Sequence, residues 1–142
     1  MAQQLIDITQ ADQESPELYL AENLHAGFPS PAADYTDRID ITHEIIRHPE
    51  TTFYARIEGD SMQDVGIFSG DIVIIDRSLT ASNGDYVAAY IDGEFTVKEF
   101  QLDEKNHCAW LIPHNDRYER IRVNEENAFI IWGVITYTIH KL

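Results

Sequence analysis

Residues 59–76 read Gly-Asp-Ser-Met-Gln-Asp-Val-Gly-Ile-Phe-Ser-Gly-Asp-Ile-Val-Ile-Ile-Asp. Three glycines divide this stretch into tight turns, and it closes on the apolar run of residues 72–75. An alternating apolar run, residues 51–57, comes just before it. A turn between two strands usually lies at the surface, so a serine at this position can be presented rather than buried. Whether Ser61 can act as a nucleophile depends on whether the chain supplies it with a base.

The composition indicates one folded domain. The chain has 142 residues, of which 44% are hydrophobic, enough to form a core. Its net charge is -15, which disfavours direct binding to nucleic acid or to an anionic membrane. The first basic residue is Arg38 and the longest apolar stretch, residues 128–134, is short, so we expect neither a secretory signal nor a membrane span. The single cysteine, Cys108, cannot form an internal disulfide, which favours the cytoplasm.

The pattern of β-branched and aromatic residues predicts a mostly β fold. We expect strands at residues 51–57, 72–75, 86–91, 94–100, 108–112, 119–123 and 128–139. Isoleucines at helical spacing between Asp40 and His48 predict a short helix that is capped by Asp40 and stopped by Pro49. Residues 1–25 are acidic and follow no sustained period, which predicts a mobile or loosely docked arm. Ser15 and Pro16 within it are also compatible with the start of a short helix.

The dipeptide Asp92-Gly93 predicts a hairpin, because both positions of a two-residue type I′ turn need positive φ. The resulting register pairs Ile91 with Glu94 and Val87 with Lys98. The expected neighbours of Lys98 on its sheet face are the apolar residues Val87, Ala89 and Phe100. Burial lowers the pKa of a lysine, which makes the amine available as a general base. The alternative is a Lys98 that extends its ammonium group to water beside Glu94, as most strand lysines do.

Glycines and polar residues recur in a fixed order along the chain. They are Gly59, Ser61, Met62, Gly66, Gly70, Asp71, Gly84, Asp85, residues 92–94, 96–98 and 111–113, Asn115, and residues 133–134. This ordered set, over about residues 25–140, resembles the LexA and UmuD family of self-cleaving serine proteases. In that family a serine is the nucleophile and a lysine is its base; the matching residues are Ser61 and Lys98, 98 - 61 = 37 positions apart. The resemblance implies a LexA/signal-peptidase-like β fold of twisted antiparallel sheets with one or two short helices.

The resemblance also implies a cleavage site. Members of the family cut their own chain between Ala or Cys and Gly, and Ala26-Gly27 matches that pattern. Residues 1–26 would then be an N-terminal arm removed by self-cleavage, and residues 27–142 a protease-like and dimerisation domain. The implied chemistry has neutral Lys98 take the Ser61 proton while Ser61 attacks the Ala26 carbonyl. Backbone N–H groups near Asp60, Ser61 and Met62 would hold the oxyanion.

The segment before the cleavage site indicates a branch of the family. A short acidic arm cannot supply the helix-turn-helix domain of a LexA-like repressor. Together with residues 27–35 it resembles the UmuD type, accessory subunits of error-prone translesion polymerases in the bacterial SOS response. The implied partners are a second copy of the chain, a UmuC-type polymerase subunit, and a RecA filament on single-stranded DNA as the activator of cleavage. No cofactor or metal is implied.

Several alternatives remain open from the residues. The chain could be a non-catalytic dimeric adaptor of a DNA polymerase, or a signal-peptidase-like protease that acts on other proteins. A triad of Ser61, His114 and an aspartate is formally possible, because triads are recognised by geometry. Cys108 beside His107 is an isolated pair and a weak zinc signal.

If Lys98 is the base, unaided self-cleavage should accelerate as pH rises toward the ordinary lysine pKa of ~10.4.

Overall fold

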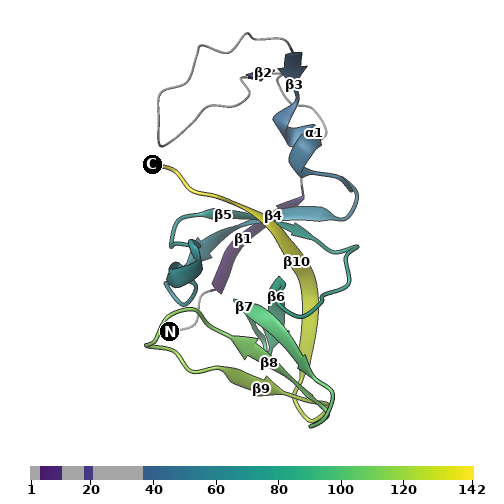
Figure 1. The fold of residues 1–142 in the computed structure, drawn as a ribbon, viewed down its shortest axis with the longest axis vertical. Coiled ribbons are helices and arrows are strands. Elements are labelled where there is room, and N and C mark those ends of the chain that lie inside the picture. Colours follow the sequence, from purple (N-terminus) through teal and green to yellow (C-terminus); the bar gives the residue numbers. More distant parts are fainter. Residues whose placement is uncertain (1–3, 11–17, 21–36) are drawn as a thin grey trace.

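The fold is dominated by antiparallel strands (Figure 1). The computed structural model describes residues 4–10, 18–20 and 37–142, with side chains from residue 40 onward. The elements are β1 (Gln4–Gln10), β2 (Leu18–Leu20), β3 (Asp37–Ile39), α1 (Ile41–Ile45), β4 (Thr52–Glu58), the 3-10 helix η1 (Gln63–Val65), β5 (Ile72–Asp76), β6 (Tyr86–Ile91), β7 (Glu94–Asp103), β8 (Cys108–Ile112), β9 (Ile121–Val123) and β10 (Phe129–Ile139). The mostly β prediction is confirmed, and every strand expected from the sequence is present.

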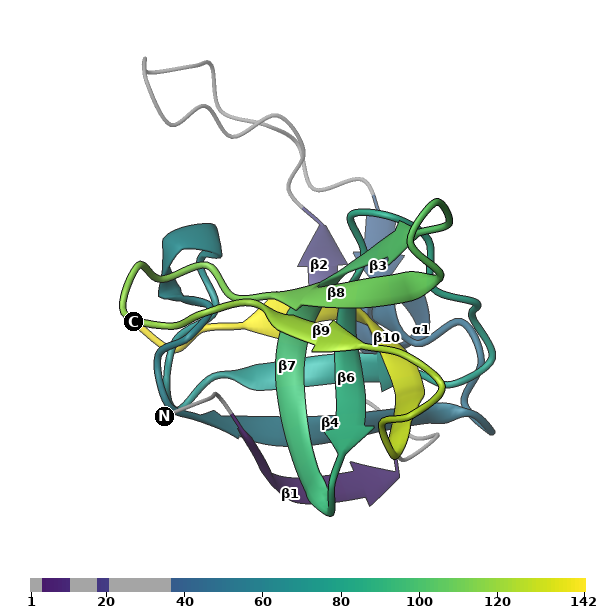
Figure 2. The same cartoon turned by 90° about the horizontal axis from the view of Figure 1, so that it is seen from below.

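One eight-stranded sheet makes the body of the molecule. Its order is β1-β4-β5-β10-β6-β7-β8-β9, and β2 and β3 form a separate two-stranded sheet. The long strand β10 joins the two halves, because its second half pairs with β5 and its first half pairs with β6. Figure 2 shows β6 and β7 running across β4 and β5. The sheet is therefore strongly curved and encloses its own core.

Two clusters of buried hydrophobic residues form the core that the curved sheet encloses. The first consists of Ala55, Ile57, Met62, Ile67, Val73, Ile75, Ala88 and Val97, and the second of Val87, Ala89, Ala109, Leu111, Val123 and Val134. Strand β6 contributes to both, since successive side chains of a strand point to opposite faces. This double burial explains why both faces of the β6–β7 hairpin are apolar in the sequence.

The β6–β7 hairpin has the predicted register. Ile91 pairs with Glu94 and Val87 pairs with Lys98. Asp92 and Gly93 have φ values of 48° and 91°, as a type I′ turn requires. The hairpin therefore places Lys98 on the face that was expected.

Gly133 explains the close contact between β10 and β5. A Cβ atom built there would lie 2.5 Å from Cγ2 of Ile75, well inside van der Waals contact. The position coincides with an irregularity in the pairing of β10 with β6, between Ile131 and Gly133. A residue without a side chain lets β10 turn from one half of the sheet to the other.

The helix is shorter than predicted. Asp40 caps it as expected, accepting a hydrogen bond from the N–H of His43 at 3.1 Å, but α1 ends at Ile45 and Ile46 is already extended. None of the α1 residues is buried. A five-residue helix without a packed face has little to extend it toward Pro49. No helix among the described residues is long and apolar enough to cross a bilayer.

The first part of the chain contains strands that the sequence did not predict. β1 pairs antiparallel with β4, and β2 pairs antiparallel with β3. Leu18 therefore lies in a strand rather than in a helix. Ser15 and Pro16, which suggested that helix, lie outside the described residues.

Candidate active site

Ser61 and Lys98 lie next to each other in the fold. Ser61 is in the turn that follows β4, Lys98 is in β7, and Lys98 Nζ lies 3.0 Å from Ser61 Oγ. Both side chains are buried, with 0% and 1% of their surface exposed. The turn therefore does not present Ser61, as the sequence had suggested it could, but buries it. Its neighbour Met62 is fully buried in the first hydrophobic cluster, and Lys98 and the backbone of His114 contact Ser61 itself.

The Lys98 amine is surrounded by neutral oxygen atoms. Besides Ser61 Oγ, its Nζ lies 2.6 Å from Thr96 Oγ1 and 3.0 Å from the carbonyl oxygen of Val97. Burial lowers the pKa of Lys98 from its ordinary value of 10.5 to about 8. The alternative of an ammonium group extended to water is thus wrong. A substantial fraction of the amine is neutral at slightly alkaline pH.

Thr96 has a role in this cluster that the sequence reasoning missed. A neutral amine has two N–H donors and one lone pair. The Val97 carbonyl can only accept, so it takes one N–H; Thr96 Oγ1 can take the other, which leaves the lone pair facing the Ser61 hydroxyl. The signal was available, since residues two apart in a strand share a face.

A second segment of the chain holds the Ser61 turn in place. The N–H of His114 donates to the Ser61 carbonyl at 2.7 Å, and the N–H of Asp64 donates to the His114 carbonyl at 2.9 Å. The side-chain amide of Asn115 donates to the Asp60 carbonyl at 2.9 Å. Residues 113–115 thus hold the turn on its other side. This contact gives a physical reason for the polar residue Asn115, two positions after Leu111-Ile112-Pro113.

The carboxylate of Asp60 strengthens the same brace. It accepts hydrogen bonds from the Tyr118 hydroxyl and the Arg117 guanidinium. The hydrogen bond from Tyr118, together with the charge of Arg117, lowers the pKa of Asp60 below its ordinary value. Asp60 is therefore ionised at neutral pH, and its side chain is committed to residues 117–118 rather than to Lys98.

The His114 ring does not serve Ser61. Its Nε2 lies 3.1 Å from Glu99 Oε1, and the ring packs edge-on against Tyr86. His114 contacts Ser61 through its backbone N–H and not through its ring. The alternative triad built on His114 is thus not formed, and among the described residues Lys98 is the side chain hydrogen-bonded to Ser61 Oγ.

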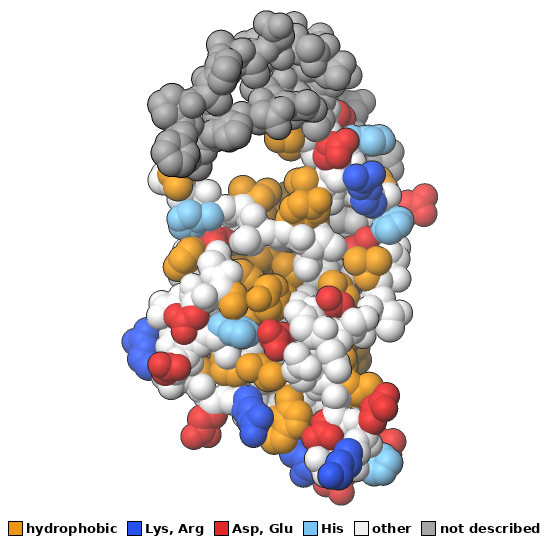
Figure 3. All heavy atoms as spheres, viewed as in Figure 1, with side chains coloured by type: hydrophobic (Ala, Val, Ile, Leu, Met, Phe, Trp, Pro, Cys, Tyr) orange, Lys and Arg blue, Asp and Glu red, His pale blue; other side chains and the backbone are white. Residues whose placement is uncertain are grey.

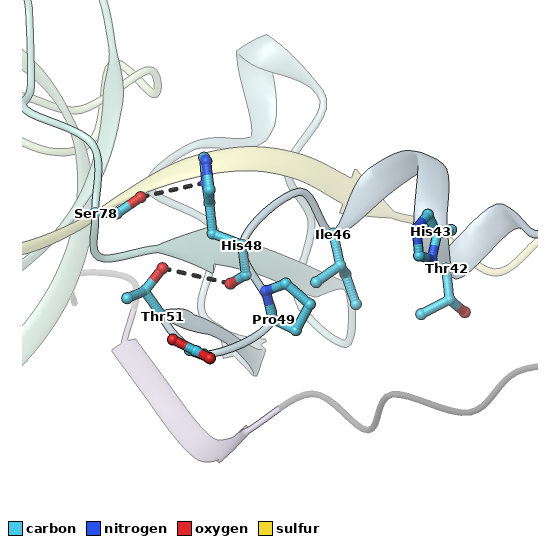
Figure 4. A pocket seen from close by; sticks show the side chains of 8 residues that line it. Thr42, His43, Ile46, His48, Pro49, Thr51 and Ser78 are labelled. Atoms are coloured by element: carbon cyan, nitrogen blue, oxygen red, sulfur yellow. Dashed lines mark hydrogen bonds between the residues drawn. The ribbon is translucent and has the colours of Figure 1, made fainter.

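Another histidine, serine and aspartate meet beside α1. His48 Nδ1 lies 2.6 Å from Asp76 and 3.3 Å from Ser78 Oγ, and Ser78 Oγ donates to Asp76 at 2.7 Å. Figure 4 shows His48 and Ser78 in a pocket that shares no residue with the Ser61 site. A nucleophile relay needs the serine and the acid on different ring nitrogens. Here both face Nδ1, so the cluster anchors the segment after α1 to the end of β5.

Ala26 and Gly27 lie outside the described residues. In the described part of the chain, no group of three or more His, Cys, Asp or Glu side chains is placed to hold a metal ion.

Figure 3 shows hydrophobic side chains gathered along the middle of one face, with charged side chains of both signs toward its edges.

Known proteins are similar in sequence to this chain over most of its length. The Peptidase S24-like family matches residues 18–136. Protein SamA of Salmonella typhimurium is 42% identical over 138 residues, which cover 96% of this chain and 94% of SamA. Protein MucA of Escherichia coli is 39% identical over 123 residues, 85% of this chain and 82% of MucA. The LexA repressor of Carboxydothermus hydrogenoformans is 38% identical over 122 residues, 84% of this chain but 59% of the repressor.

Proposed function

The chain belongs to the peptidase S24-like family, as a self-cleaving serine peptidase of the UmuD type, and we propose that Ser61 and Lys98 are its nucleophile and general base. The observation that carries this proposal is the 3.0 Å contact between Lys98 Nζ and Ser61 Oγ. A buried amine with a pKa of about 8 has the neutral form that a base requires. No other described side chain is placed to take the Ser61 proton.

The proposed reaction transfers one acyl group. Lys98 Nζ takes the proton of the Ser61 hydroxyl as Oγ attacks the carbonyl carbon of Ala26. The peptide bond then breaks, the nitrogen of Gly27 accepts a proton from Lys98 and leaves as a free amine, and Ala26 remains esterified to Ser61. Water hydrolyses this ester and restores the hydroxyl.

The turn is suited to hold the oxyanion. Backbone N–H groups of Asp60, Ser61 and Met62 are the candidate donors. Within residues 4–10, 18–20 and 37–142, the N–H of Met62 meets no hydrogen-bond acceptor. Because Met62 is packed in the core and the turn is braced through Asn115, these donors are fixed before the substrate arrives.

The proposed product comprises residues 27–142, and the peptide lost comprises residues 1–26. We assign the product to a homodimer that works with a UmuC-type polymerase subunit in SOS mutagenesis, with a RecA filament as the trigger. The support is the sequence similarity to SamA and MucA over nearly the whole chain.

The test is the intact mass of the purified chain after incubation at pH 9, and separately with a recombinase filament on single-stranded DNA. The expected result is a fragment that begins at Gly27. Ser61→Ala and Lys98→Ala should stay whole, whereas Lys105→Ala, which alters an exposed lysine, should cleave normally. Normal processing of either site variant would overturn the assignment.

A protease that acts on other proteins is the less favoured function. The Ala26-Gly27 pair supplies a matching cleavage site in the chain itself, which favours self-cleavage. Because Ser61 is 0% exposed, a substrate from this chain or from another one requires the surroundings of Ser61 to open. Incubation of the Lys98→Ala chain with the unaltered chain separates the cases. If the unaltered chain also cuts the variant, cleavage between molecules occurs; if the variant stays whole, cleavage takes place within one chain.

A further inference from the structure

We propose that cleavage turns β4 into a docking strand for an extended segment of a partner protein. The proposal depends on the proposed function only for the position of the cut. It depends on the fold for the surface that the cut uncovers. The partner segment is expected to add to the sheet in the place that β1 occupies in the intact chain.

β1 is the outermost strand on its side of the sheet, and β4 lies between β1 and β5. Figure 2 shows β1 alongside β4 at the margin of the body. Six residue pairs join the two strands, from Gln4 opposite Glu58 to Gln10 opposite Phe53. Every residue of β1 precedes Ala26, whereas every residue of β4 follows Gly27. Cleavage between them therefore leaves β1 without a covalent link to its own sheet.

The covalent link matters because a single short strand binds weakly. While the chain is intact, β1 meets β4 at an effective concentration on the order of millimolar. A released peptide in a micromolar solution is diluted roughly a thousandfold relative to that value. Loss of β1 then exposes the N–H and C=O groups along one side of β4. Such an unpaired edge readily accepts another strand.

The register specifies what the new strand should look like. Phe53, Ala55 and Ile57 of β4 belong to the core side of the sheet, whereas Arg56 is exposed. In β1, the residues opposite Ile57, Arg56 and Ala55 are Leu5, Asp7 and Ile8. An irregularity between Leu5 and Asp7 brings Leu5 opposite Ile57. The expected ligand is an extended segment with apolar residues opposite Ala55 and Ile57 and an acidic residue opposite Arg56.

Charge distinguishes this ligand from a second copy of β4. Pairing of β4 with itself about Ala55 would place Arg56 opposite Tyr54, so the guanidinium would gain no carboxylate. A register centred on Ile57 would place Arg56 opposite Glu58, but it would overlap only residues 56–58 of β4. A β1-like segment supplies one from Asp7. Arg56 is one of ten Lys and Arg residues on a chain of net charge -15, and its NH1 donates a hydrogen bond to the Gly70 carbonyl at 3.0 Å. An acidic partner strand therefore fits better than self-association.

The first experiment uncouples the cut from Ser61. In a Ser61→Ala chain, residues 21–25 are replaced by the recognition sequence of a site-specific protease, the chain is cut, and the small fragment is removed by gel filtration. Amide hydrogen exchange in β4 should accelerate at least tenfold, while β5, which keeps both neighbours, should not change. Unchanged exchange in β4, or a loss of protection that includes β5 and β10, would overturn the proposal.

The second experiment measures docking with a fluorescent peptide of residues 1–12. It should bind the cut chain at least tenfold more tightly than the intact chain, because β1 blocks the edge of the latter. Ile8→Pro in the peptide removes an N–H donor and should abolish binding, whereas Thr9→Val should leave it unchanged. The Asp7→Lys peptide should bind the cut chain more weakly than the unaltered peptide does. The same Asp7→Lys peptide should bind a cut chain that carries Arg56→Glu as tightly as the unaltered pair binds. Binding that ignores the Arg56 charge, or a cut chain that dimerises and excludes the peptide, would refute the assignment.

A failure here is distinguishable from failure of the proposed function. The Ser61→Ala chain cannot use Ser61, so both docking experiments run whether or not self-cleavage occurs. If Ser61 is not the nucleophile, the intact-mass experiment shows it and the docking result stands. If β4 accepts no strand, the docking result shows it and the peptidase assignment stands.

Discussion

Replacing Lys98 by methionine should make the stability of the protein depend differently on pH. Lys98 is 1% exposed, and burial lowers its pKa from 10.5 to about 8. Between these two values the unfolded chain binds the proton more tightly than the folded one. At about 1.4 kcal/mol for each unit of pKa, protonation of Lys98 costs the folded state about 3 kcal/mol at neutral pH.

The sign of the effect follows from the proton balance. The free energy of unfolding of a chain with Lys98 should rise by about 3 kcal/mol as pH increases from about 8 to 10.5, because the unfolded chain loses its advantage over that range. Lys98→Met has no proton to bind, so its curve lacks this rise. In chains that carry Ser61→Ala, the substitution also removes the hydrogen bonds of Lys98 to Thr96 and Val97, which lowers the free energy of unfolding of the variant by about the same amount at every pH. The pH-dependent part of the difference therefore reports Lys98 alone.

The measurement is urea denaturation followed by tryptophan fluorescence between pH 6.5 and 10.5. Both chains should carry Ser61→Ala so that neither cleaves during the experiment. The matched control is Lys105→Met, whose lysine is exposed in the β7–β8 turn and should give a curve parallel to the reference. Parallel curves for Lys98→Met as well would refute the reasoning, because they would mean that Lys98 titrates at its ordinary pKa in the fold.

Three further predictions concern the same site and the sheet that holds it. Unaided self-cleavage should accelerate about tenfold between pH 7 and 9 and then level off, with a midpoint near 8 rather than ~10.4, as read from gel time courses; a flat profile would contradict Lys98 as the base. Thr96→Val removes the 2.6 Å hydrogen bond to Lys98 and should slow self-cleavage by at least about tenfold, whereas Thr96→Ser should restore most of the rate; equal rates for both would exclude a role for the hydroxyl. Gly133→Ala should lower the free energy of unfolding by about 1–3 kcal/mol in the same urea assay, because the new methyl group meets Ile75; an unchanged midpoint would mean that the strands separate freely.

The sequence was most informative where local chemistry fixes geometry. Asp92-Gly93 determines a turn type, the turn type determines the register, and the register determines the face on which Lys98 lies. Each step involves residues close together in the chain. The face of the lysine was therefore predictable without any knowledge of the rest of the sheet.

Other features depend on contacts between distant parts of the chain. The residues next to Ser61 in the sequence do not reveal that Met62 packs into the core or that Lys98 and the backbone of His114 contact the serine. Likewise, β1 is too weakly patterned to be recognised alone. Its pairing with β4 supplies the order that its own sequence does not specify. Both failures have the same cause, since local propensity is overridden by tertiary contacts.

The low pKa of Lys98 depends on what is kept away from it as much as on burial. The chain carries 25 acidic residues, and one carboxylate beside Nζ would raise the pKa of the amine and hold its proton. Its described partners are instead two hydroxyls and a carbonyl, none of them charged. The nearest acid in the sequence, Glu99, falls on the other face of β7 by strand alternation, where His114 and Gln101 hold its two oxygens. A carboxylate on the face of Lys98 would raise the pKa of the amine and so remove the neutral form that the proposed base requires, without touching Ser61. The alternation along β7, which keeps Glu99 off the face of Lys98, therefore supports the proposed role of Lys98 as a base.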